Sequence, residues 1–167
     1  MLYGAVPPTF VGAARDFQLV GRVGLAMSAA RSGCVDGHRG PWTSQTTVTL
    51  DDVAAEYVRF PYPVTDLRGQ ITFEGERLRL NSITGRHGRG KVEATGAVDV
   101  SGSQISAIDL AIDGTDLEFD DAIVSALPAE ARERWAALHL GGNLNTHTRI
   151  FLDPETRSMK HESAIDL

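Results

Sequence analysis

GQITFEGERLRLNSI, residues 69–83, is the stretch that decides the fold class of this chain. Apolar residues occupy every second position on either side of a turn formed by Glu74, Gly75 and Glu76. Side chains alternate between the two faces of a β-strand, so this spacing predicts two strands, each with one apolar and one polar face. The glycine-containing turn predicts that the two strands form an antiparallel hairpin. The apolar positions of this hairpin are Ile71, Phe73, Leu78 and Leu80.

The same alternation continues over most of the 167 residues. The polar faces carry threonine and charged residues, which is typical of antiparallel sheets with one wet face and not of buried parallel sheets. We therefore expect a mainly β protein built as an antiparallel meander. The last two strands should flank a turn at residues 153–156 and bring His147 near His161 across the hairpin. The alternating stretches are residues 16–29, 45–53, 90–100, 105–114 and 143–167.

One stretch, at about residues 121–139, breaks the period of two and predicts an amphipathic helix. Its apolar residues recur at the helical spacing of i, i+4, i+8 and i+11. Asp120 or Asp121 is positioned to cap a short turn that Pro128 separates from the main helix. We expect this helical insert to lie over one edge or end of the sheet. The residues of its apolar stripe are Leu127, Ala131, Trp135 and Leu138.

Length and charge limit the classes of function. A chain of 167 residues suits one domain. A net charge of −6 argues against general affinity for nucleic acid or anionic headgroups, because both bind basic surfaces, but it leaves the acyl part of a lipid as a ligand. Cys34 is the single cysteine, so we expect no internal disulfide and a bystander thiol in a loop. The sequence shows no signal peptide and no run of the ~20 apolar residues that a membrane span needs.

Residues 85–92, GRHGRGKV, match the first positions of a phosphate-binding loop. Such a loop also needs a buried strand before it, a helix after it, and a hydroxyl residue after the lysine. Here Val92 occupies the hydroxyl position, and an alternating strand follows Lys91. We therefore interpret this segment as a turn between consecutive strands and predict no nucleotide binding.

Other catalytic and metal-binding patterns are also missing from the sequence. The five histidines form no H-E-x-x-H or paired Cys/His pattern, and no G-x-S-x-G elbow occurs. The acidic stretch at residues 113–121 lacks the spacing of a calcium loop, so capping and solvation explain it more simply. We expect no catalytic residue, no metal and no cofactor, and thus a protein that is not an enzyme.

The stretch from residue 60 to residue 98 resembles a repeat unit of the AsmA-like proteins, relatives of TamB and of the bridge-like lipid-transfer group. Its first part, FPYPVTDLRG, fits an entry step of the form F/L-P-x-P-V-x-x-L-x-G. A hairpin of the form I-x-F-x-G-x-x-L-x-L follows, and then a strand of the form G-x-x-G-x-G-x-V-x-A-x-G-x-V. The resemblance covers roughly residues 45–152, and the helical stretch is similar to an insert in large members of the group.

The resemblance implies a curved, open, taco-like antiparallel sheet with an apolar concave face. It further implies a C-terminal-type piece of a longer, inner-membrane-anchored envelope protein of the periplasm, which carries phospholipid or assists outer-membrane biogenesis. Its partners would be phospholipid or another acyl-chain lipid and the neighbouring repeats of the same polypeptide. We expect one β-rich module, residues 1–167, with a loosely assigned strand and loop (1–44), the best-matching repeat (45–119), the helical insert (120–142) and a terminal hairpin (143–167).

The apolar positions of the strands are the candidate residues of a lipid groove. The same residues could instead form the core of a two-layer sandwich or pack under the helix, which would make the chain a structural or adhesive β-repeat without a ligand. The candidate positions are Val48, Leu50, Ile71, Phe73, Leu78, Leu80, Val92, Val98, Ile108, Leu110 and Ile112.

Overall fold

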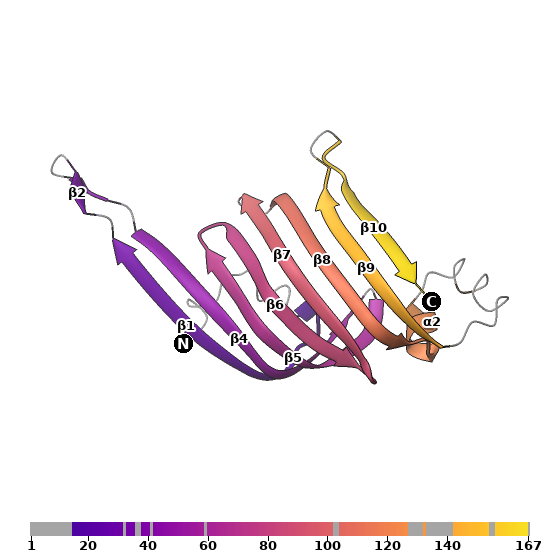
Figure 1. The fold of residues 1–167 in the computed structure, drawn as a ribbon. Coiled ribbons are helices and arrows are strands. Elements are labelled where there is room, and N and C mark those ends of the chain that lie inside the picture. Colours follow the sequence, from indigo (N-terminus) through magenta and orange to yellow (C-terminus); the bar gives the residue numbers. More distant parts are fainter. Residues whose placement is uncertain are drawn as a thin grey trace.

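Residues of the chain form one antiparallel sheet of eight strands in the order β1-β4-β5-β6-β7-β8-β9-β10 (Figure 1). The structure is a computed structural model and describes residues 15–31, 33–35, 38–40, 42–58, 60–101, 104–126, 132, 142–153 and 156–166. The strands are β1 (Val20–Arg31), β4 (Trp42–Tyr57), β5 (Phe60–Glu74), β6 (Arg77–His87), β7 (Gly90–Ser101), β8 (Gln104–Glu118), β9 (Asn143–Leu152) and β10 (Met159–Asp166). A separate two-stranded ladder of β2 (Cys34–Val35) and β3 (His38–Arg39) stands where a loop was expected.

From β4 to β10 the strands follow one another in the sheet in chain order, and β1 pairs with β4 across the β2–β3 ladder, so the fold is a meander. Glu74 pairs with Arg77, which leaves a two-residue turn whose Gly75 has φ 58°. His87 pairs with Gly90 around Gly88, where φ is 57°. A positive φ is a conformation that glycine adopts without strain. The predicted hairpin at residues 69–83 and the predicted turn within residues 85–92 are both confirmed.

The sheet stays open, because β1 and β10 each pair with a single neighbour in the part of the chain that the structure describes. The strands bend along their length, so the sheet is curved (Figure 1). This confirms the expected fold class, a mainly β protein with an open antiparallel sheet.

Bulges recur along the sheet: three alternate strands each carry one, and β5 carries a further one at Asp66, where φ is 53°. Asp52 of β4, Ser82 of β6 and Asp116 of β8 have φ values of 59°, 46° and 55°, and the pairing register shifts beside each of them. A bulge bends its strand and increases the local twist. In each case the next residue is apolar and buried; these residues are Val53, Ile83 and Leu117.

Glycine is required where the bent strands approach most closely. Gly96 of β7 has φ 134°, and a Cβ atom there would lie 2.1 Å from the carbonyl oxygen of Asp109. Gly69 of β5 has φ 135°, and its Cβ would lie 2.6 Å from the carbonyl oxygen of Ser82. Any side chain at either position would push the neighbouring strand away.

The hydrophobic core lies on one face of β4, β5 and β6. Its most buried members, Val48 and Val53, are 1% and 2% exposed. Partly buried apolar residues of β5, β6 and β7, and of the segment just before β1, pack around them. The core comprises Val48, Leu50, Val53, Phe73 and Ile83, with Leu19, Leu67, Ile71, Leu78, Leu80 and Ala94 against it.

Helix α2 (Asp121–Ala126) follows β8 and contacts β5. Oδ1 of Asp120 accepts hydrogen bonds of 3.0 Å from the backbone N–H groups of Ala122 and Ile123, which confirms the predicted cap. The rest of the predicted helix, including Trp135, lies outside the described residues except for Arg132. No helix in the described ranges is long and apolar enough to span a membrane.

The last hairpin, β9–β10, differs from expectation in its register. His147 pairs with Ala164, whereas His161 pairs with Ile150. The two imidazoles therefore point to opposite faces of the sheet, and the predicted proximity of His147 and His161 is wrong. The turn is held by Asp153, whose Oδ1 accepts a 3.0 Å hydrogen bond from the N–H of Thr156.

Candidate functional site

The candidate site is the apolar face of the sheet, where the pairing register aligns apolar residues in rows across the strands. Directly paired residues of an antiparallel sheet point to the same face, so each row is continuous. The longest row crosses all eight strands and consists of Leu25, Val48, Ile71, Leu80, Gly96, Leu110, Ile150 and His161. A second row consists of Met27, Thr46, Phe73, Leu78, Val98 and Ile108.

The remaining candidate positions fall on the same face. Leu50 pairs with Val23 beside the first row, Ile112 pairs with Ala94, and Val92 pairs with Gly114. The structure thus brings every predicted groove residue onto one face. Their role as a lipid site stays a prediction.

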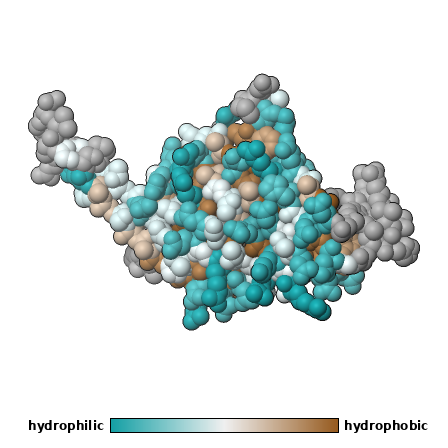
Figure 2. All heavy atoms as spheres, viewed as in Figure 1, coloured by the Kyte–Doolittle hydropathy of each residue, from teal (hydrophilic) through white to brown (hydrophobic). Residues whose placement is uncertain are grey.

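Exposure varies along this face. Val48, Leu50 and Phe73 are buried in the core of β4–β6, whereas the other candidate positions are half-buried. On β1 the row residues Leu25 and Met27 are 40% and 53% exposed. In the view of Figure 2, hydrophilic residues make up most of the visible surface and hydrophobic residues are interspersed among them. The accessible part of the apolar face therefore lies over β6–β9 and β1.

Two contributions to this face were missed in the sequence. Ile150 and Thr148 of β9 continue the rows from Leu110 and Ile112, but the stretch at residues 143–152 was assigned only as a strand. Val23, Leu25 and Met27 of β1 lie in the alternating stretch at residues 16–29 but were not among the candidate groove residues. Their alternation with Val48 and Leu50 on β4 was the signal that they belong to the same surface.

The opposite face is polar and is crossed by ion pairs. Arg77 donates hydrogen bonds of 2.6 and 2.7 Å to Asp99, and Arg149 donates bonds of 2.8 and 2.9 Å to Asp109. These bidentate hydrogen bonds, together with the arginine charge, hold the pKa of the Asp99 and Asp109 carboxyls below its ordinary range.

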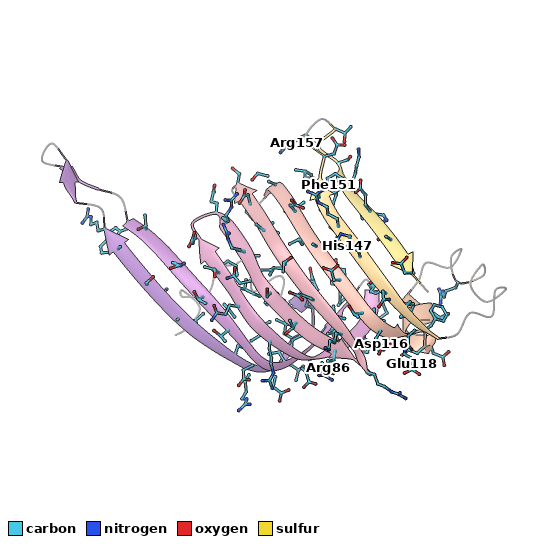
Figure 3. The ribbon with its side chains drawn as sticks, in the orientation of Figure 1. Arg86, Asp116, Glu118, His147, Phe151 and Arg157 are labelled. Atoms are coloured by element: carbon cyan, nitrogen blue, oxygen red, sulfur yellow. The ribbon has the colours of Figure 1, made fainter. Side chains whose placement is uncertain are left out.

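Further polar contacts follow β9 on this face. Nδ1 of His147 lies 2.6 Å from Oδ1 of Asp113. The guanidinium of Arg149 lies 5.3 Å from the ring centroid of Phe151, an aromatic residue on the polar side. Figure 3 shows His147 and Phe151 on this strand. A shallow depression of ≈ 270 Å³ on this side has a polar lining of Gln45, Thr72, Glu74, Arg77, Arg79 and Asn81.

A buried polar cluster at the end of β6 was missed in the sequence. His87 is 9% exposed; its Nδ1 lies 2.6 Å from the carbonyl oxygen of Pro63, and its Nε2 lies 2.8 Å from Oδ2 of Asp120. Pro63 offers a carbonyl oxygen and Asp120 a carboxylate oxygen, and both are hydrogen-bond acceptors. The ring also stacks on Tyr62 with centroids 4.0 Å apart. The segment was interpreted as a turn between consecutive strands, and that interpretation left the burial of His87 unpredicted.

The electrostatics of this cluster favour a charged Asp120 and a neutral Tyr62. Burial raises the pKa of the Tyr62 hydroxyl to about 12, and the charge of Asp120 adds to the shift. For Asp120 burial is the largest single influence and acts upward. The hydrogen bonds from His87, Ile123 and Ala122 and the charge of His87 together outweigh it and lower the pKa of the carboxyl. The cluster thereby fixes the start of β5, the end of β6 and the start of α2.

The arrangement of these residues does not resemble a nucleotide or metal site. Lys91 is exposed and pairs with Arg86 and Thr115 in the ladder, away from the His87 cluster. No group of three potential metal ligands occurs in the described part of the chain. Three of the acids at residues 113–121 are engaged by the chain's own groups: Asp113 by His147, Asp116 by Asn143, and Asp120 by His87.

No family model, no curated protein and no solved structure matches this chain. Its function is therefore inferred from the geometry of the sheet and from the sequence resemblance described above.

Proposed function

We propose that the chain is a non-enzymatic module of the cell envelope whose apolar face holds the acyl chains of phospholipid or another lipid. The carrying observation is the set of rows of mainly apolar residues on one face of an open sheet, with the Arg77–Asp99 and Arg149–Asp109 ion pairs on the other face. An exposed apolar face of this kind needs a cover, and acyl chains provide one. The resemblance to AsmA-like and TamB-related proteins supports the same role.

The accessible rows define where the lipid would lie. Acyl chains would lie against Leu110, Ile112 and Ile150, which are half-buried on β8 and β9 and are free of charge. Burial of apolar area contributes roughly 25 cal/mol per Å², and similar aliphatic side chains repeat along the row. A chain that leaves one position finds an equivalent contact at the next, so movement along the face has low barriers. No residue has to perform chemistry.

The setting of the module follows from the resemblance. We place it in the periplasm as part of an inner-membrane-anchored protein that serves phospholipid transport or outer-membrane biogenesis. Neighbouring repeats of the same polypeptide are among its proposed partners. Nucleic acid and nucleotides are not among the proposed partners.

A structural or adhesive β-repeat without a ligand is the second candidate function. The observation that favours it is the burial of Val48 and Val53, which are 1% and 2% exposed. This part of the apolar face serves as the core of the fold. In that case the half-buried rows on β7–β9 would only border the core.

Neighbouring residues of β8 on opposite faces provide a matched test. A photo-crosslinking amino acid replaces Leu110 on the apolar face or Ala111 on the polar face, and the purified chain is irradiated with phosphatidylglycerol–phosphatidylethanolamine vesicles. We expect lipid adducts by mass spectrometry at position 110 and at least about tenfold fewer at position 111, because acyl chains contact one face.

Substitutions give a second readout by native mass spectrometry. Co-purifying phospholipid should be lost in Leu110→Asp and retained in Ala111→Asp, with circular dichroism confirming that both variants fold. Equal crosslinking at positions 110 and 111, or a lipid-free chain throughout, would contradict the lipid role and favour the structural module.

A further inference from the structure

The two edge strands of the sheet differ in how they are protected against pairing with another strand. The side chains of β1 and β10 are exposed along both strands. β10 carries Lys160, Glu162 and Asp166, and charges on an edge strand oppose pairing with further strands. In β1 the run at residues 23–30, VGLAMSAA, has no charge and no proline. β1 is therefore the unprotected edge.

The backbone of β1 is also regular enough to accept a further strand. Its register with β4 shifts only between Gly21 and Arg22, and pairing is continuous from there to Arg31. Eight extended residues offer a ladder of about 26 Å. The side chains of Val23, Leu25 and Met27 on its apolar side are 53%, 40% and 53% exposed. An added strand with apolar residues at alternate positions would cover them.

We infer that β1 pairs with β1 of a second copy of this chain, antiparallel and around a two-fold axis. A register centred on Leu25 places this residue opposite Leu25 of the second copy. Val23 then lies opposite Met27, and Arg22 lies opposite Ser28, so no like charges face each other. The edge is thus complementary to itself, which an isologous dimer requires.

The two-fold axis would stand perpendicular to the sheet, so the apolar faces of both copies lie on the same side. The row that begins at Leu25 would continue into the second copy without interruption. Head-to-tail pairing of β1 with β10 is disfavoured, because β10 carries three charged side chains. It would also generate an open-ended filament and not a closed dimer. The inference concerns the protein surface and holds with or without lipid binding.

Sedimentation velocity of the lipid-free, full chain over a concentration series tests the inference. We expect a dimer of two 18.0 kDa chains. Leu25→Lys should weaken the dimer at least about tenfold, because it opposes two ammonium groups at the axis and removes an apolar contact. Ser163→Lys, the matched change on the β10 edge, should leave the dimer intact. A parent chain that stays monomeric to about 100 μM would overturn the inference.

Crosslinking identifies the strand that β1 meets. In a Cys34→Ser background, Leu25→Cys should form a disulfide-linked dimer under mild oxidation, because paired residues across antiparallel strands have Cα atoms ~4.5–5.5 Å apart. Ser163→Cys alone should not. Disulfides that form only when the Leu25→Cys and Ser163→Cys chains are mixed would show head-to-tail pairing and refute the two-fold dimer.

Discussion

The two faces of this sheet are built from the same strands but are held together by different forces. On the apolar face Val48 is 1% exposed and packs among aliphatic neighbours of three strands. On the polar face the side chains of the Arg149–Asp109 pair are 52% and 61% exposed. Burial of apolar surface is strong and non-directional, whereas exposed ion pairs contribute little to stability and depend on geometry. Most of the folding free energy therefore comes from the apolar face. The ion pairs of the polar face mainly favour one pairing register of the strands.

A charge placed on each face in turn should give the largest difference. Val48→Asp puts a carboxylate into the core, where it has no partner and loses its hydration, so we expect loss of the cooperative fold. Thr49→Asp changes the next residue, which is exposed on the polar face, and should leave a folded chain. Thermal unfolding followed by circular dichroism separates the two outcomes. Similar melting temperatures for both variants would mean that the two faces do not differ as described.

An intermediate effect is expected at the buried His87–Asp120 cluster. The pKa of Asp120 is lower in the folded chain than its ordinary value of 3.8. A carboxyl with a lowered pKa stabilises the fold above its unfolded pKa, and this contribution is lost as the pH falls through the folded pKa. Asp120→Asn keeps a capping side chain but removes this charge.

The measurement is the free energy of unfolding of the parent chain and of Asp120→Asn as a function of pH. We expect the stability advantage of the parent to be full at pH 6 and to shrink progressively as the pH drops below 3.8. An advantage that stayed constant over this range would show that the charged carboxyl contributes no stability there.

The smallest effect should come from an ion pair on the polar face. Arg149→Ala and Asp109→Ala each remove one partner of an exposed bidentate pair, whose arginine also lies over Phe151. A double-mutant cycle by urea denaturation should give a coupling free energy smaller than the stability change caused by Asp120→Asn. A coupling larger than that would place an essential part of the stability on the polar face.

The strands and their faces could be predicted from the sequence because they follow from local alternation. The hairpin at residues 69–83 and the glycine turn at Gly88 need only neighbouring residues to specify them. The shared face of Val48, Leu80 and Leu110 could be predicted too, because the alternation within each strand identifies its apolar face.

Features that depend on distant partners could not be predicted in this way. His87 meets Asp120 across 33 positions and Pro63 across 24, so no local pattern reveals its burial. The bulges at Asp52 and Ser82 appear in the sequence as two consecutive polar residues, which equally describe a surface turn. The predicted proximity of His147 and His161 was wrong for a related reason. The length of a turn sets the register of its hairpin, and a shift of one residue moves a side chain to the opposite face of the sheet.

The bulges of β4, β6 and β8 recur once per hairpin, so a similar local bend returns with each of these hairpins. A hairpin is then the smallest segment that can be gained or lost while the direction of the next strand and the side of its apolar residues stay the same. Insertion of a single strand would reverse both the strand direction and the phase of the bend. Length in such a molecule can change by whole hairpins, and each addition extends the same arc.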